Sequence, residues 1–431
     1  MKKSTSLFKN RNFSLFFAGS IVSQIGSIFI NFAAGLFILD LTGKAMYMSV
    51  FMAISAAMYI VMQPFLGAVV DRLNKVKVLY LLDYASGLSD LALAALLFTT
   101  DDPTLILIGL FVNGIINSTM MAMYQPTSQS MIPLMLKEAE LNPAYSFMST
   151  LANFQNILGV LFAAICYATF GFKWLLIFNG VTFVIAAFLE MFIKIEHTPK
   201  ASEGGFNKLI SEVKEGYSYM HKKKELINMA KVAVIMNFFL VGAFGITMPY
   251  MINNDLGLPP YILAGVSVAM SIGGIIMSLK IANQQVTDAG DRIYYGFLWG
   301  WFCLVAILLD YYLFSTQMIP LLAFVGILFI TMVLFGASGS YIQIPLNTSY
   351  AKRVDKDMMA RVMALRHALS SVATPLAMIV YGFVIDGLGV LASLSLGVIG
   401  IGFATLYSKF NTHIRSLNDT PEVILEKVNT Q

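Results

Sequence analysis

The chain has 431 residues, of which 58% are hydrophobic and 12% are charged. The charged fraction is about half of that in an ordinary soluble domain, and long apolar runs recur from Phe13 to Leu406, so the composition excludes a water-soluble fold and indicates a membrane protein. The formal net charge of +4 is small and dispersed, which does not indicate a nucleic-acid partner.

The amino-terminal sequence Met1-Lys-Lys is similar to the start of a signal peptide. The apolar stretch behind it is too long for one and lacks a small-residue cleavage site, so we expect it to be retained as the first membrane helix. Farther along the chain, Cys166 and Cys303 both lie in apolar runs. They predict neither a disulfide framework nor a thiolate metal cluster.

Twelve segments of the chain are apolar enough and long enough to be membrane helices. A bilayer core about 30 Å thick is crossed by about 20 helical residues, and a helix satisfies its backbone polar groups internally. The sequence therefore predicts an all-α membrane protein with twelve transmembrane helices in two six-helix bundles. The segments are 13–39, 46–70, 78–98, 105–124, 144–170, 174–193, 229–251, 261–282, 293–314, 319–344, 360–385 and 388–407.

The longest polar segment, 195–228, separates six of these spans from the other six. We interpret it as a cytoplasmic linker, although its lysines could also contact anionic lipid heads. The linker divides the chain into an N-terminal bundle at 1–194 and a C-terminal bundle at 229–409, followed by a cytoplasmic tail at 410–431.

Lysine and arginine gather on one side of the predicted spans. Of the 28 such residues, all but Lys44 and Lys173 lie on the side of the linker or at helix ends that face it. The positive-inside rule assigns this side to the cytoplasm. We therefore expect a multi-pass protein of the cell (inner or plasma) membrane with both termini in the cytoplasm.

The two predicted bundles share a local pattern. Tyr124-Gln-Pro126 ends the fourth span, Ile344-Pro345 ends the tenth, and each is followed by a polar loop and a new helix. Two six-helix halves in parallel arrangement are one way to build an alternating-access carrier.

The second span runs into a tight basic turn that begins at Gly67 and reads Ala-Val-Val-Asp71-Arg72-Leu-Asn-Lys75-Val-Lys77. Glycine permits close approach of two helices, the aspartate can cap or pair with a helix end, and the three cations hold the turn at the anionic cytoplasmic face. This turn resembles the G-x-x-x-D-R-x-G-R-K signature of the major facilitator superfamily.

Further residues resemble one subgroup of that family, the twelve-span drug and macrolide efflux permeases, which include siderophore exporters. They are Pro64, Asp83, the stretch 126–144 and Met358-Met359-Ala-Arg361-Val362. The resemblance implies a secondary transporter that exports a small amphipathic drug or metabolite in exchange for protons by rocker-switch alternating access. In that mechanism the Asp71–Lys77 turn stabilises the outward-open state against span eleven.

Three departures from the family pattern limit the mechanism. Asn74 stands where the signature usually has glycine, and Asn113 stands where proton-coupled exporters often carry an arginine. Span five also lacks the proline of the antiporter motif. Proton antiport is therefore implied by the resemblance and not by these residues.

Two carboxylates lie in the third span, seven residues apart on one helical face. Asp83 is near the cytoplasmic end. We expect it to pair with Arg72, Lys75 or Arg361 in a gate, and a transport role is the alternative. Asp90 is near the middle and has no obvious partner. Because an ionised group there costs at least ~2.5–3.5 kcal/mol, Asp90 is a candidate proton-coupling residue, with hydrogen bonding inside the bundle as the alternative.

The predicted conformational gate combines the basic turn with charged residues near it or near the start of span eleven. Arg366, beside His367, can reach the cytoplasm, so a gate or structural role is favoured over ligand binding. Glu190 is near the inner face and receives no role. The gate residues are Gly67, Asp71, Arg72, Lys75, Lys77, Asp83, Arg361 and Arg366.

Polar side chains recur along spans that are expected to line a cavity. Ser20, Gln24, Ser27 and Asn31 form a stripe on span one, which indicates either a central polar pathway or hydrogen bonds between helices. The candidate substrate residues from both bundles are Gln24, Ser27, Asn31, Asn113, Asn117, Asn153, Asn237, Tyr341 and Gln343. Few buried cations accompany them, which disfavours anionic substrates such as sugar phosphates.

Other functions have weaker support in the sequence. There is no G-x-x-x-x-G-K-[ST] phosphate loop, no H-E-x-x-H and no G-x-S-x-G, so ATP-driven transport and an intramembrane enzyme are disfavoured. Nutrient uptake and lipid translocation by the same fold stay open. We expect a monomer that binds a small-molecule substrate, protons or another coupling ion, and membrane lipids, with no cofactor, metal or nucleic acid.

Overall fold

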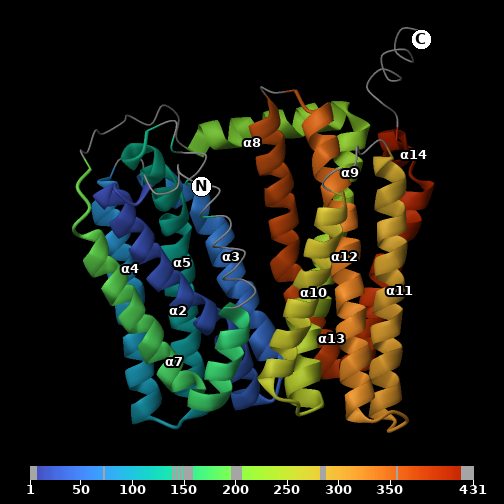
Figure 1. Cartoon of the computed structure of the whole chain (residues 1–431), viewed down its shortest axis with the longest axis horizontal. Coiled ribbons are helices and arrows are strands. Elements are labelled where there is room, and N and C mark those ends of the chain that lie inside the picture. Colours follow the sequence, from blue (N-terminus) through green and yellow to red (C-terminus); the bar gives the residue numbers. More distant parts are fainter. Residues whose placement is uncertain are drawn as a thin grey trace. The chain divides into compact units, whose positions relative to one another are not determined.

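The computed structural model describes residues 7–70, 73–137, 140, 144, 148, 159–195, 206–281, 288–355 and 358–418. Within these ranges the chain forms helices joined by turns and contains no strand (Figure 1). The prediction of an all-α membrane protein is thereby confirmed. The elements are α2 (Arg11–Thr42), α3 (Ala45–Val70), α4 (Lys75–Thr99), α5 (Pro103–Met135), α7 (Val160–Glu190), α8 (Phe206–Lys222), α9 (Lys224–Leu240), η2 (Val241–Thr247), η3 (Tyr250–Asp255), α10 (Pro260–Ile281), α11 (Ala289–Ser315), α12 (Leu321–Arg353), α13 (Met359–Phe410), α14 (Thr412–Arg415) and η5 (Ser416–Asn418).

Several helices of the first half begin where the sequence supplies a capping side chain. Asn10, Asn74 and Asp102 accept a hydrogen bond from a backbone N–H in the first turn of α2, α4 and α5, respectively. Such caps satisfy donors that a helix start leaves unpaired. Asn74, the departure from the family signature, therefore has a local structural role, because it starts α4 directly after the basic turn.

Ten helices in the described ranges are long and apolar enough to cross a membrane. Two of them contain a break, at Gly171 in α7 (φ 75°) and at Gly389 in α13 (φ 84°). A positive φ of this kind favours glycine, and at each site two helical arms meet where the sequence predicts the boundary between consecutive spans. The expected count of twelve spans stays a prediction, because only residues 144, 148 and those from Gly159 onward are described in the fifth span.

The chain divides into two compact units. The first comprises Met1–Leu209 with Pro259–Ala264, and the second comprises Ile210–Leu258 with Gly265–Gln431. In the first unit, α7 packs against α2 and α4, while α5 packs against α3 and α4. In the second unit, α13 packs against α9 and α11, and α11 packs against α12.

Hydrogen bonds from side-chain amides join three helix ends in the first unit. Asn10 donates to the carbonyl of Met135 at 2.6 Å, which joins the start of α2 to the end of α5. Asn12 donates to the carbonyl of Lys194 at 2.7 Å and accepts from its N–H at 3.1 Å. The first and last described helices of this unit therefore have their outer ends on the same side, as an even number of spans requires.

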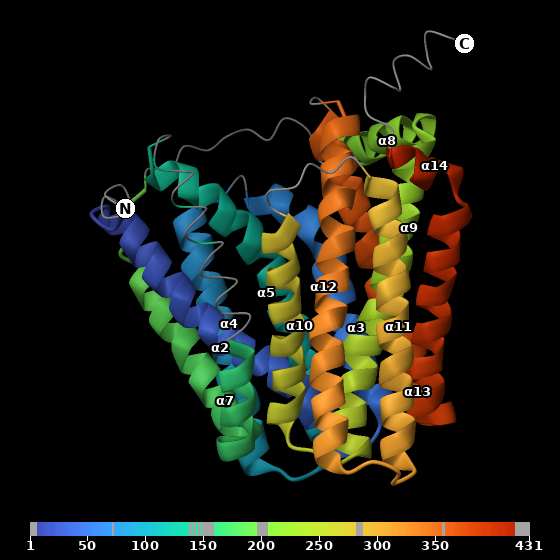
Figure 2. The ribbon, with the colours of Figure 1, turned by 45° about the vertical axis from the view of Figure 1, so that its right-hand side comes forward.

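The second unit shows the same arrangement. Asn228 near the start of α9 accepts hydrogen bonds from Tyr407 and from Asn411, at the end of α13. Arg353 at the end of α12 donates to the carbonyl of Ser416 at 3.0 Å. In Figure 2, α8 and α14 lie at this end of the second unit.

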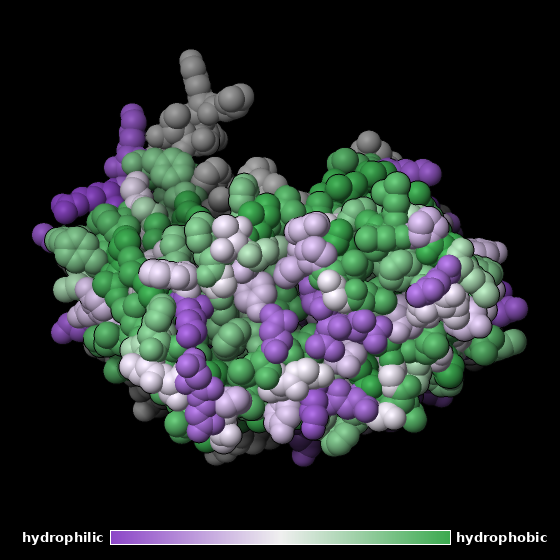
Figure 3. Space-filling model, turned by 90° about the horizontal axis from the view of Figure 1, so that it is seen from below, coloured by the Kyte–Doolittle hydropathy of each residue, from purple (hydrophilic) through white to green (hydrophobic). Residues whose placement is uncertain are grey.

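Large apolar side chains cover the outer faces of many helices. Leu88, Leu279, Ile330 and Ile399 are each more than 60% exposed. Figure 3 views the end opposite α8, where hydrophilic residues are interspersed with hydrophobic ones. This distribution is expected for helices that are immersed in lipid.

Two predicted helix ends are wrong. The fourth span does not end at Tyr124-Gln-Pro126, since α5 continues through Pro126 to Met135, and the tenth does not end at Pro345, since α12 continues to Arg353. A proline removes one hydrogen bond and bends a helix, but in a membrane protein the helix often continues. The expected loops after these prolines are correspondingly shorter, and the expected linker contains the helix α8.

Candidate functional site

The second unit contains a pocket of about 390 Å³ between α9, α12 and α13. Its apolar lining residues come mainly from α9, while the other lining residues carry amide, hydroxyl, imidazole and guanidinium groups. The lining residues are Ala233, Met236, Asn237, Leu240, Val241, Gln343, Arg366, His367, Ser370 and Ser371. A pocket with one apolar wall and several converging polar groups can hold a small amphipathic molecule.

Arg366 has a fixed position at this pocket. It donates from Nη1 to Asn347 Oδ1 at 2.8 Å, and its guanidinium carbon lies 5.1 Å from the centre of the Tyr350 ring. Tyr350 is fully buried, so the cation rests on a rigid surface. The sequence-based expectation for Arg366 was a gate, whereas the structure places it at the pocket wall.

Two of the candidate substrate residues from the C-terminal half lie together at this pocket. Asn237 and Gln343 both line it, and Asn237 Oδ1 accepts a hydrogen bond of 3.1 Å from the Thr374 hydroxyl. Tyr341 is not among the lining residues. Its ring contacts Trp299 and Arg292 of α11, because residues two apart on a helix point to different sides.

In the first unit, the fully buried Asp90 binds three amide groups. Asn113 and Asn117 of α5 donate to Oδ1 at 2.8 and 2.9 Å, and Asn179 of α7 donates to Oδ2 at 2.6 Å. The sequence offered no obvious partner for Asp90, and these contacts agree with the alternative of hydrogen bonding inside the bundle. These hydrogen bonds replace the water that an ionised carboxylate loses on burial, and they join α4, α5 and α7 at one point.

Asn179 is the residue of this network that the sequence did not reveal. It is a single amide in an apolar span, 89 residues from Asp90. Only the packing of α4 against α7 brings the two side chains together. Asn113 and Asn117, expected to face a substrate pathway, donate to Asp90, and that pathway role stays a prediction.

The polar stripe predicted on span one does not face a single environment. Ser20 is buried and forms a hydrogen bond of 3.3 Å with the Tyr124 hydroxyl. Ser27 donates to the carbonyl of Ser23 in its own helix. Gln24 is half-buried and Asn31 is exposed.

Near the Ser20 end of this stripe, two acidic side chains are buried in the first unit. Asp83 of α4 is 1% exposed and Glu190, the last residue of α7, is 0% exposed. Glu190 was expected near the inner face with no special role, and it does end α7, but helices enclose its side chain completely, so its burial requires an explanation. Asp83 was expected in the gate, and no ion pair of Asp83 occurs among the residues that the structure describes.

The predicted gate is only partly described. Gly67 lies in the last turn of α3, and Lys75 and Lys77 lie in the first turn of α4. Asp71 and Arg72 are outside the described residues, as is Asn153, the substrate candidate from span five.

Arg361 was expected to face the gate at the basic turn. It pairs instead with Glu215 of α8 at 2.8 Å. The carboxylate comes from the expected linker, whose helical structure the sequence analysis did not predict.

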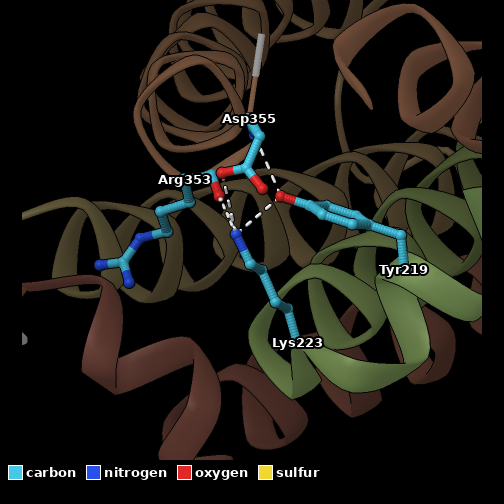
Figure 4. Close-up of polar contacts among 4 residues, drawn as sticks. All are labelled: Tyr219, Lys223, Arg353 and Asp355. Atoms are coloured by element: carbon cyan, nitrogen blue, oxygen red, sulfur yellow. Dashed lines mark hydrogen bonds and ion pairs between the residues drawn. The ribbon is translucent and has the colours of Figure 1, made fainter. Parts of the chain in front are cut away.

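A second ion pair holds the end of α8 against the end of α12 (Figure 4). Lys223 donates to the Tyr219 hydroxyl at 2.6 Å, to the carbonyl of Arg353 at 3.0 Å and to Asp355 at 3.4 Å. Burial lowers the pKa of Lys223, but Tyr219 and Asp355 outweigh this and leave it raised. The hydrogen bond from Tyr219 and the charge of Lys223 hold the pKa of Asp355 below its usual value, so both groups stay charged over a wide pH range.

Metal binding has no support in the described part of the chain. Those residues contain no group of three or more His, Cys, Asp or Glu side chains that could hold a metal ion.

Comparison with known proteins agrees with this architecture. The sequence model of the Major Facilitator Superfamily matches residues 16–378. Macrolide efflux protein A of Streptococcus pyogenes is 22% identical over 382 residues, which cover 88% of this chain and 90% of that protein. The MFS-type transporter YkuC of Bacillus subtilis is 26% identical over 264 residues, or 59% of either chain. The structure is similar to that of a bacterial homologue of the iron transporter ferroportin in its inward-facing state, with a TM-score of 0.71, 11% identity, and coverage of 95% of this chain and 99% of that chain.

Proposed function

The chain belongs to the Major Facilitator Superfamily, and from this membership we propose that it exports a small amphipathic drug or metabolite in exchange for protons. The resemblance predicted from the basic turn after Gly67 is confirmed by the family match. The chain is a multi-pass membrane transporter. Its substrate, the direction of transport and the coupling ion belong to the proposal.

The pocket of the second unit is the observation that carries the proposal. Its apolar wall, which includes Met236 and Leu240, can receive the hydrophobic part of a ligand, and methionine adapts to different shapes. Polar groups of the same pocket, including Asn237 of α9, Gln343 of α12 and Arg366 of α13, can bind the polar part. Such a division suits an amphipathic molecule better than a sugar, whose hydroxyl groups require polar partners on all sides.

The direction of transport is supported by similarity alone. Macrolide efflux protein A covers most of the chain, although at 22% identity. Nutrient uptake and lipid translocation by the same fold are the alternatives. Because the relatives are bacterial, we propose the cell membrane as the location, with the Lys- and Arg-rich ends of both units in the cytoplasm.

The transport cycle that we propose is alternating access. The two units change their relative orientation, and the turn with Asp71 and Arg72 stabilises one of the two states. Gly67, Lys75 and Lys77 support that turn from the neighbouring helix ends.

Transport by the purified full-length protein in proteoliposomes tests this proposal. Cationic, neutral and anionic amphipathic compounds are offered as a panel, and proton and sodium gradients are imposed separately. We expect accumulation of at least one compound that depends on the proton gradient. Transport driven by sodium alone, or no transport of any compound under either gradient, would overturn the proposal.

A variant pair tests the pocket itself. Gln343→Leu removes an amide from the pocket at nearly constant volume and should weaken substrate transport. Thr348→Val is the matched control on the same helix, because Thr348 is half-buried and bonds only to the carbonyl of Ile344. Equal transport by the two variants would exclude the pocket as the substrate site.

A further inference from the structure

Three carboxylate oxygens in the first unit are buried without a hydrogen-bond partner. Both Oε atoms of Glu190 and Oδ2 of Asp83 are unpaired within the described residues, and the two side chains are 0% and 1% exposed. They contrast with Asp90, which lies seven residues from Asp83 on the same helix and binds three amides.

Four helices surround the two carboxyl groups. Glu190 extends from α7 toward α2, where a Cβ atom added to Gly19 would lie 3.3 Å from its Oε1. The glycine therefore leaves space into which the carboxyl group is directed. The neighbouring Ser20 forms a hydrogen bond with Tyr124 of α5, and Asp83 belongs to α4.

The charges at this site are all acidic. Asp83 and Glu190 interact electrostatically with each other, and both act on the hydroxyl of Tyr124. Asp83, Glu190 and Tyr124 are the titratable groups that face one another from α4, α7 and α5, while α2 contributes only the hydroxyls of Ser20 and Ser23. In the described ranges, no lysine, arginine or histidine pairs with either carboxylate.

The doubly ionised pair is the least favourable state of this site. A buried charge without donors costs several kcal/mol in effective desolvation, and two nearby like charges also repel. One proton reduces both penalties, since it neutralises one carboxyl group and thereby removes the repulsion between the two charges. The amides around Asp90 favour the charged form of that carboxylate, and the pair Asp83 and Glu190 has no such donors within the described residues.

We propose that Asp83 and Glu190 together form the site that binds the coupling proton of this transporter. The inference rests on the proposed proton exchange and names the residues that perform it. On loading, an O–H bond of hydronium breaks and one forms at a carboxylate oxygen of the pair, and release reverses this step with no other bond changed. Tyr124 is a positioning residue, because its hydroxyl can donate to the carboxylate that remains charged.

Infrared difference spectroscopy tests the site without any substrate. Spectra of the purified full-length protein are compared between about pH 5 and about pH 8, a range in which an unperturbed carboxylate stays ionised. The wild-type protein should show the C=O band of a carboxylic acid that loses its proton within this range. Glu190→Gln and Asp83→Asn should each abolish that band or move it outside the range, whereas the matched control Asp90→Asn should retain it.

Other outcomes overturn the inference. A wild-type protein without a titrating carboxylic acid refutes it even if the variants do not fold. A band that persists in Glu190→Gln, or disappears only in Asp90→Asn, assigns the proton elsewhere. Tyr124→Phe adds a separate check, since loss of its donor should shift the midpoint of the band toward higher pH, and an unchanged midpoint excludes the positioning role.

The result is independent of the transport assay. If the band behaves as expected but no compound is transported in exchange for protons in proteoliposomes, the proposed function fails and the proton site stands. If transport is proton-driven in Glu190→Gln as in the wild-type protein, the function stands and the coupling role fails.

Discussion

Replacing Asn179 by alanine should destabilise the first unit more than the same replacement of Asn113, although both side chains donate to Asp90. Both residues are buried, so both replacements remove the same atoms from a similar environment. They differ in what remains. Asp90 Oδ1 keeps the donor Asn117 when Asn113 is lost, whereas Oδ2 has no other donor in the described structure when Asn179 is lost.

The size of the difference follows from the charge. A hydrogen bond to a charged group contributes about 1.5–3 kcal/mol in soluble proteins. Interhelical hydrogen bonds in membranes average only about 0.6 kcal/mol and reach about 1.7. Because Asn179→Ala also leaves a buried charged oxygen unpaired, we expect a loss of about 2 kcal/mol, against about 0.5–1 kcal/mol for Asn113→Ala.

Reversible unfolding in mixed detergent micelles, followed by loss of helical circular dichroism, measures both values. Asn117→Ala, which also leaves Oδ1 with one donor, is an additional control and should resemble Asn113→Ala. Equal losses for Asn179→Ala and Asn113→Ala would show that Asp90 carries no charge that depends on Asn179. The reasoning about the network would then be wrong.

Three further predictions concern other parts of the chain. In Gly336→Ala the new Cβ would lie 1.8 Å from the carbonyl oxygen of Met270, so α10 and α12 must separate, and the melting temperature should fall by an amount that corresponds to about 1–3 kcal/mol; an unchanged temperature would contradict this close crossing. Lys223→Met should increase cleavage of the linker by added protease. The lowered pKa of Asp355 contributes stability above the unfolded value of 3.8, which is lost as pH falls through the folded value. The raised pKa of Lys223 contributes stability below the unfolded value of 10.5, which is lost as pH rises through the folded value. Cleavage of the wild-type linker that depends on this pair should therefore be constant between about pH 5 and about pH 9, and a slope in this range would refute the pairing. Asp71→Asn should reach the membrane in normal amounts but transport slowly, and full transport by this variant would exclude the turn from the gate.

The fold could be predicted because a membrane imposes a simple rule. Apolar runs of sufficient length must be helices, and glycines such as Gly171 and Gly389 lie between consecutive runs. The prolines misled the prediction, since Pro126 and Pro345 were interpreted as helix ends but lie inside α5 and α12. Whether a proline ends or bends a helix depends on neighbouring groups that local sequence does not contain.

The site was predicted less well because its contacts join distant segments. Asp90 could be recognised as a buried carboxylate from its place in span three, but its donor Asn179 lies three spans later. The burial of Glu190 was not anticipated because its position near the end of a helix suggests access to the surface, while α2 covers it at Gly19. Asn237 and Gln343 line one pocket and Tyr341 does not, because the rotation of each helix about its axis depends on its neighbours.

The pocket is lined by residues of α9, η2, α12 and α13, which all belong to the second unit. A molecule bound there keeps the same contacts when the two units change their relative orientation, so it moves together with the second unit. Substrate selectivity is then determined at the binding step, by the residues of this pocket. If the substrate binds there, mutations in the first unit should change the rate of transport more than the choice of substrate.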